Sequence, residues 1–266
     1  MKITNVHMIK YVVGLACLLA LCTSVRAQVN IETKRRLDSK LGWYNDVGLS
    51  LKYQSGNTDL LKFETSLRSD YLVGKYHTFG ILTFQQAKQG GQVYTDKGFV
   101  HLRGARSTSA HLGIEIFLQK QYNESILLQD RNLAGGGIRI SFVKQRKNTK
   151  NSTGLNLYFG IGAMWENETI NDKGHGEIET NIIRSTNYVS AAWRIDKRFT
   201  VILTGYYQPY LQRFADFRVL SESRFDFRAT ERVSFNIRLN LRYDSEPPTS
   251  VEAHDVEIVN GLNYKF

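Results

Sequence analysis

Strict alternation of apolar and polar side chains is the feature of this sequence that most constrains its fold. Residues 233–243 carry an apolar side chain at every odd position and a polar one at every even position. The odd positions of residues 155–165 are also apolar, and residues 61–71 follow the same pattern with interruptions at Thr65 and Ser69. A period of two is typical of a β-strand, because successive side chains of a strand point to opposite faces. These segments therefore predict strands with one apolar face and one polar face.

Segments of this kind recur along the whole chain and predict about twelve strands, within a range of about 10 to 14. Their expected starts are near residues 43, 60, 76, 93, 109, 132, 154, 178, 198, 214, 231 and 255. Each segment has roughly ten residues or more, which is enough for a tilted strand to cross an apolar band about 25 Å tall. The predicted fold class is all-β, with an antiparallel up-and-down β-barrel over residues 43–266.

The connections between these segments alternate between short and long. Residues 107–110, 196–197 and 229–231 are tight links, whereas residues 89–96, 123–132, 167–177, 208–216 and 245–255 form longer ones. All three prolines lie in the long links, where a strand loses no hydrogen-bond donor. Only residues 144–154 break the alternation. Short turns at one rim and long loops at the other are typical of bacterial outer-membrane barrels.

The same alternation would also suit a soluble barrel with its apolar face inward, so the aromatic residues decide between the two orientations. Two levels of aromatic side chains are expected, one at each rim of the barrel. The first level holds Tyr53, Tyr122, Trp165, Tyr207 and Tyr243, and the second holds Trp43, Trp193, Phe199 and Phe266. Aromatic belts at two heights suit the two interfaces of a membrane. We therefore expect the apolar face to contact lipid.

The first residues have the pattern of a secretory signal peptide. Lys2 and Lys10 precede a short apolar stretch, and residues 25–27 offer small residues for cleavage after Ala27. Both cysteines of the chain lie inside this segment, so the mature protein would have no disulfide and no thiolate metal site. Residues 28–42 are polar and basic, and we interpret them as a periplasmic linker. An exported chain makes nucleic acid an improbable partner for this basic run, which is better explained as a solvated charge cluster.

Three groups of residues resemble a known family. They are Gly56-Asn57-Thr58-Asp59, Asp130-Arg131-Asn132-Leu133-Ala134-Gly135-Gly136-Gly137, and residues 242–248 together with Asp255 and the terminal Gly261-Leu262-Asn263-Tyr264-Lys265-Phe266. Their order and spacing resemble the family of salt-induced outer-membrane proteins, a domain family of unknown function. The resemblance covers residues from about 48 to the end of the chain. It implies a barrel in the outer membrane of a Gram-negative bacterium, surrounded by lipid and lipopolysaccharide, with no enzyme activity and no established substrate.

The last predicted strand has an aromatic end that could serve in assembly. Leu262, Tyr264 and Phe266 share one face of this strand. Such an ending resembles the signal by which the barrel-assembly machinery recognises its clients, although an ordinary closing strand could also end in this way. No Ser or Asp stands with a His in a recognisable catalytic motif, so we expect no enzyme. Asp172, His175 and Glu177 lack a metal-defining spacing, and we expect neither a metal nor a cofactor.

Charged side chains on the polar face would line the barrel interior. Two neighbouring strands concentrate arginines there, together with two acidic residues, and the set comprises Arg218, Glu222, Arg224, Asp226, Arg228, Arg238 and Arg242. A stripe of arginines favours anions in a pore. The alternative is that these arginines only neutralise neighbouring carboxylates, and the sequence favours neither interpretation. The expected function is a narrow channel for small solutes with a weak preference for anions, and the alternative is a non-conducting structural or envelope-stress barrel with a lumen plugged by paired charges.

Overall fold

The computed structural model describes residues 41–56, 59–143, 154–172 and 174–264, and it consists of β-strands with one short 3₁₀ helix. The elements are β1 (Gly42–Gln54), β2 (Leu60–Val73), β3 (Tyr76–Gln89), β4 (Gln92–Ser107), β5 (Leu112–Asn123), η3 (Glu124–Ile126), β6 (Leu128–Val143), β7 (Gly154–Asp172), β8 (Gly176–Arg194), β9 (Phe199–Tyr210), β10 (Arg213–Arg228), β11 (Val233–Asp244) and β12 (His254–Tyr264).

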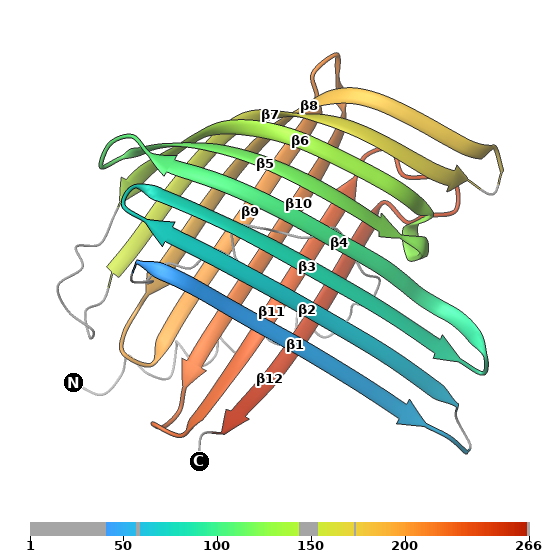
Figure 1. Ribbon diagram of the computed structural model, residues 1–266, viewed down its shortest axis with the longest axis horizontal. Coiled ribbons are helices and arrows are strands. Elements are labelled where there is room, and N and C mark those ends of the chain that lie inside the picture. The colour runs from blue at the N-terminus through green and yellow to red at the C-terminus, as the bar shows by residue number, and fades with distance from the viewer. Residues whose placement is uncertain (1–40, 57–58, 144–153, 173, 265–266) are drawn as a thin grey trace, which may run out of the picture.

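The twelve strands form one sheet in chain order, β1 to β12, and each strand is antiparallel to its neighbours. The sheet curls so that β1–β6 pass in front of β9–β12 with the opposite tilt, and β7 and β8 bend over the top of the view between them (Figure 1). Within the described residues, no strand ladder joins β1 to β12. The predicted fold class, with about twelve antiparallel up-and-down strands, is confirmed.

The largest differences between predicted and observed strand starts are those of β5 and β6. The strand begins at Leu112 because the amides of Thr108 and Ser109 both donate to the Leu112 carbonyl and hold the preceding residues in a turn. β6 begins at Leu128, four residues before its expected start, because η3 compacts the link into a single short turn. Leu127 closes that turn in the left-handed region, with a φ of 58°.

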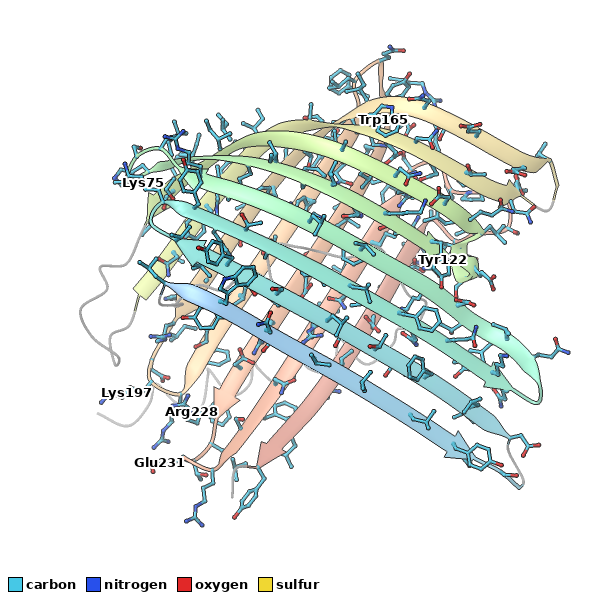
Figure 2. The ribbon with its side chains drawn as sticks, in the orientation of Figure 1. Lys75, Tyr122, Trp165, Lys197, Arg228 and Glu231 are labelled. Carbon is cyan, nitrogen blue, oxygen red and sulfur yellow. The ribbon has the colours of Figure 1, made fainter. Side chains whose placement is uncertain are left out.

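The short turns gather at one end of the barrel, as the alternation of links predicts. Lys75, Lys197 and Glu231 come from three different turns and lie at the same end in Figure 2. Tyr122, next to the link that carries η3, lies toward the other end. We call these two ends the short-turn end and the long-loop end.

The outer face of the sheet is apolar and its inner face is largely polar, which is the reverse of a soluble β-barrel. On β5, Glu115, Gln119 and Gln121 point inward and are buried, whereas Ile116 and Leu118 point outward and expose 65% and 58% of their surface. The same contrast recurs along the other strands, where large apolar side chains are exposed on the outer face and charged side chains are buried inside, together with some apolar ones such as Phe79. An apolar outer surface around a polar interior is the arrangement of a barrel that is surrounded by lipid.

Aromatic side chains on the outer face cluster toward the rims. The rings of Tyr207, Phe217 and Tyr243 follow one another across β9, β10 and β11, with centroids 5.6 Å apart at each step. At the start of β1, Trp43 packs on Tyr71 with centroids 4.6 Å apart. The part of the chain that the structure describes contains no helix long and apolar enough to cross a membrane.

Candidate functional site

A cluster of ionised side chains fills the interior on one side of the barrel near the long-loop end. Each of its members exposes 8% or less of its surface, and each lies on the inner face of β6, β7, β8, β10, β11 or β12. We call this set the buried ion cluster, and it comprises Arg131, Glu166, Glu168, Arg184, Asp216, Arg218, Arg242, Asp244 and Asp255.

Arg218 is the centre of the buried ion cluster. Its Nη1 donates to both carboxylate oxygens of Glu166 at 2.9 Å, and its Nη2 donates to Glu168 Oε1 at 3.1 Å. Its Nε donates to Asp244 Oδ2 at 2.8 Å. Arg218 lies on β10 and the two glutamates lie on β7, so these bonds reach over the inner faces of β8 and β9. One guanidinium therefore ties together three strands.

The other arginines complete the cluster around the same carboxylates. Arg184 Nε donates to Glu166 Oε1 at 3.0 Å and its Nη1 donates to Asp216 Oδ1 at 2.8 Å. Arg131 donates to Glu168. Arg242 pairs with both Asp244 and Asp255, at 3.2 Å in each case.

The buried ion cluster holds four arginines and five carboxylates, so its own charge does not favour anions. Removing a buried charge from water is costly, and such pairs are tolerated only where hydrogen bonds satisfy both partners. The many bonds to Arg218 meet this requirement. The cluster is consequently a rigid filling of this side of the lumen.

The predicted lumen residues divide into two groups. Arg218 and Arg242 belong to the buried ion cluster. Arg224 and Asp226 pair with each other at 2.9 Å, with side chains 42% and 32% exposed. The nearest contact of Arg238 to an acid is its Nε at 3.9 Å from Glu222 Oε1, with its side chain 47% exposed.

Arg228 is the last residue of β10, and its side chain is exposed at the short-turn end, close to Lys197 and Glu231 in Figure 2. In the closing strand, Leu262 and Tyr264 expose 72% and 54% of their surface. Phe266 lies outside the described residues.

None of the five carboxylates of the buried ion cluster is among the sequence-predicted lumen residues. Glu166 and Glu168 alternate with outward-facing residues such as Trp165, so the period of two does indicate that they point inward. Their pairing with Arg218 joins residues that are 50 and 52 positions apart in the chain and lie on non-neighbouring strands. Such contacts follow from how the sheet curls, which alternation does not specify.

Several residues that carry the family resemblance meet in this cluster. Arg131 comes from the motif that opens β6, and Arg242, Asp244 and Asp255 come from the closing segment of the chain. The glycines of the same β6 motif have a different role, which is to let β6 approach β7 closely. A Cβ on Gly137 would lie 2.4 Å from the Ile161 carbonyl oxygen, so this position admits no side chain without moving β7.

A polar cavity of about 490 Å³ occupies the other side of the barrel. It lies against the inner faces of β1 to β5, and Arg238 of β11 also borders it. Its lining combines apolar side chains, among them Leu49, Phe99 and Ile126, with hydroxyl and carboxamide groups, which belong to Ser50, Ser66, Thr83, Gln85, Gln121 and Asn123. Buried side chains outside both the cavity and the buried ion cluster, such as Phe79, Met164 and Tyr188, fill further parts of the interior.

No group of three or more His, Asp or Glu side chains in the described ranges is placed to hold a metal ion. Asp172 and His175 instead take part in a contact between two long loops. Asp172 Oδ2 accepts hydrogen bonds from His175 Nδ1 at 3.0 Å and from Thr249 Oγ1 at 2.8 Å. The link between β7 and β8 is thereby joined to the link between β11 and β12.

Two solved structures are similar to the chain at low sequence identity. A NanC porin structure has 10% identity and a TM-score of 0.45, over 84% of this chain and 99% of the porin. A deletion mutant of the TodX monoaromatic hydrocarbon channel has 8% identity and a TM-score of 0.38, over 84% of this chain and 79% of the channel. No curated protein matches the chain. The model of a family described as proteins of unknown function, DUF481, matches residues 47–266, and the chain therefore belongs to this family.

Proposed function

We propose that this chain is a β-barrel of the bacterial outer membrane that passes small polar solutes through a narrow lumen. The apolar outer face, with Ile116 and Leu118 well exposed, supports a lipid environment. The proposal also covers the start of the chain, most of which lies outside the described residues. Residues 1–27 would act as a cleaved signal peptide and residues 28–42 as a periplasmic linker, with lipopolysaccharide and lipid around residues 43–266.

Assembly forms part of this proposal. Leu262, Tyr264 and Phe266 would present the closing strand to the barrel-assembly machinery during insertion. The exposed outward positions of Leu262 and Tyr264 are compatible with that role. The proposal assigns no catalytic residue, metal or cofactor to the chain.

The observation that carries the channel function is the polar cavity of about 490 Å³ beside β1 to β5. The buried ion cluster occupies the opposite side, so a solute would pass along the cavity and beside Arg238. Toward the short-turn end it would meet the half-exposed side chains of Arg224 and Asp226. The route is narrow because it uses only part of the cross-section.

A weak preference for anions is the finer part of the proposal. Arg218 and Arg242 are neutralised by buried carboxylates and contribute little field to the route. Arg224 is paired with Asp226, so Arg238, whose Nε lies 3.9 Å from Glu222, and Lys97, which also borders the cavity, supply most of the positive potential along the route. We therefore expect selectivity to be modest.

A non-conducting structural barrel is the second candidate, and the buried ion cluster favours it. Bonds from Arg218 to Glu166, Glu168 and Asp244 hold β10 to β7 and β11 across the interior. If side chains close the remaining route in the same way, the protein would add a rigid barrel to the envelope without transport.

Liposome swelling separates these two functions. Purified protein is reconstituted into liposomes, which are then placed in isotonic solutions of arabinose, glucose or sucrose, solutes of increasing size. The channel function predicts swelling that decreases steeply with solute size. Liposomes that contain folded protein and do not swell with any solute would support the structural barrel.

A further inference from the structure

The polar cavity beside β1 to β5 has the features of a binding site as well as of a passage. Its volume of about 490 Å³ falls within the range of small-molecule pockets. Five adjacent strands supply its lining, so its groups are held by the sheet.

Gln85 provides the first sign of a ligand. Its side chain is on the inner face of β3, borders the cavity and is only 8% exposed. Within the described part of the chain, its carboxamide makes no side-chain hydrogen bond. A buried carboxamide carries two donors and an acceptor that need partners, and a solute in the cavity could supply them.

The neighbouring polar groups have the same character. Gln121 is 7% exposed, and its Oε1 accepts a hydrogen bond from Gln119 at 2.8 Å, which leaves its NH₂ group directed to other partners. The hydroxyls of Ser50, Ser66 and Thr83 border the same space. Hydroxyl and carboxamide groups both donate and accept, which suits a solute with several hydroxyls.

Charge around the cavity favours one negative group on that solute. Lys97 and Arg238 are the cations of its lining and Glu64 is the acid. Glu64 is already paired with Lys62, with Nζ and Oε1 2.8 Å apart. Arg238 borders the cavity with its side chain 47% exposed, and a guanidinium binds a carboxylate with two parallel hydrogen bonds.

We propose that this cavity binds small polyhydroxylated monocarboxylates, with Arg238 holding the carboxylate and Gln85 and Gln121 holding hydroxyl groups. This inference names the solute class of the proposed channel and rests on that function. Neutral sugars would lose the bond to Arg238, and simple carboxylates would lose the bonds to the carboxamides. Selective binding should therefore require both chemical features.

Saturation-transfer difference NMR on the full barrel tests this inference, with gluconate as the probe. Lauryldimethylamine oxide is a suitable detergent, because it carries no hydroxyl groups that could compete. We expect saturable transfer to gluconate, and weaker transfer to glucose and to acetate at equal concentration. Binding should weaken by about 10-fold or more in Arg238→Gln and by about 2- to 10-fold in Gln85→Leu.

Two matched variants separate the site from general effects of substitution. Gln86→Leu places the same change one residue away on the outer face of β3, where the side chain donates to Asp96. Arg232→Gln removes the same charge from the turn between β10 and β11. Both should bind gluconate like the unaltered protein.

The proposal is overturned if gluconate does not bind, if acetate or glucose binds equally well, or if Arg238→Gln and Gln85→Leu bind like their controls. The same preparation is tested for liposome swelling. A barrel that swells liposomes without binding gluconate would refute the site and leave the channel intact. A barrel that binds gluconate without swelling would retain the site and refute the channel.

Discussion

Tyr188 on β8 donates a hydrogen bond from its hydroxyl to Glu115 Oε2 on β5, at 3.3 Å, across the inner faces of β6 and β7. The strands beneath the ring have glycines where a side chain would obstruct it. A Cβ on Gly160, the residue paired with Tyr188, would lie 2.0 Å from the ring. The absence of a side chain at Gly160 thus leaves room for the Tyr188 ring, whose hydrogen bond links β8 to β5 inside the barrel.

This contact predicts the effect of adding a side chain at position 160. Gly160→Ala should displace Tyr188 from its buried position and lower the free energy of unfolding by about 1–3 kcal/mol, the usual cost of overpacking. Urea unfolding in lipid vesicles, followed by tryptophan fluorescence, measures the change. Gly205→Ala is the matched control, because its nearest atom outside the neighbouring residues would be 3.9 Å away. Equal stability of the two variants would contradict the bracing role.

The buried ion cluster should tolerate the loss of its central arginine poorly. Arg218→Leu leaves Glu166, Glu168 and Asp244 without their shared partner and should cost about 3–5 kcal/mol, because uncompensated charges remain buried. Arg224→Leu removes a half-exposed pair and should cost at most about 1 kcal/mol. The same unfolding assay compares both variants. A smaller loss in Arg218→Leu than in Arg224→Leu would show that the cluster does not stabilise the barrel.

Acid should release the contact between the two long loops at Asp172. This residue ends the 19-residue strand β7, beyond the length needed to cross a membrane. The hydrogen bonds from His175 and Thr249 lower the pKa of its carboxyl below the ordinary 3.8. The folded pKa is the lower one, so the contact has its full stability above 3.8 and loses it as the pH falls through the lowered value.

The NMR shift of the Thr249 amide reports on this titration. It should change with a midpoint below 3.8 in the unaltered protein, and Asp172→Asn should remove the transition. Thr249→Val keeps the bond from His175 and should raise the midpoint, followed at the Gly174 amide that donates to Asp172 Oδ1 at 3.3 Å. A midpoint at or above 3.8 in the unaltered protein would contradict the assignment.

Adjacent residues of β11 should respond in opposite ways to exchange of their chemistry. Leu239 shares the outward parity of Leu241 and Tyr243, so Leu239→Arg should cost about 2–4 kcal/mol near the middle of the membrane. Position 238 faces the lumen, so the Arg238→Leu variant should insert almost normally. Heat-modifiable migration of the folded protein in outer-membrane fractions measures both. Equal insertion of the two variants would show that the faces are assigned incorrectly.

The sequence is sufficient to predict the strands, their antiparallel order and the face on which each side chain lies. Residues 233–243 show why, because the strand and its two faces follow from a period of two within one segment. The antiparallel order follows from links that are too short for a crossover between parallel strands. The partners of Arg218 are different. Asp244 lies on the neighbouring strand, but Glu166 and Glu168 lie on β7, and only the curvature of the whole sheet brings Glu166 within 2.9 Å. The cavity likewise depends on which interior groups leave space between them, and Gln85 has no local pattern that distinguishes it from other inward-facing amides.

Single-channel recording in a planar bilayer tests the central claim most directly. The account predicts small conductance steps and, under a salt gradient, a reversal potential with modest anion preference. Arg224→Gln combined with Arg238→Gln should shift that potential toward neutrality, because Arg238 borders the cavity and the Arg224 side chain is half-exposed. Conductance with unchanged selectivity would make the arginines structural partners only. Correctly inserted protein that never conducts would contradict the channel and favour the barrel closed by its buried charges.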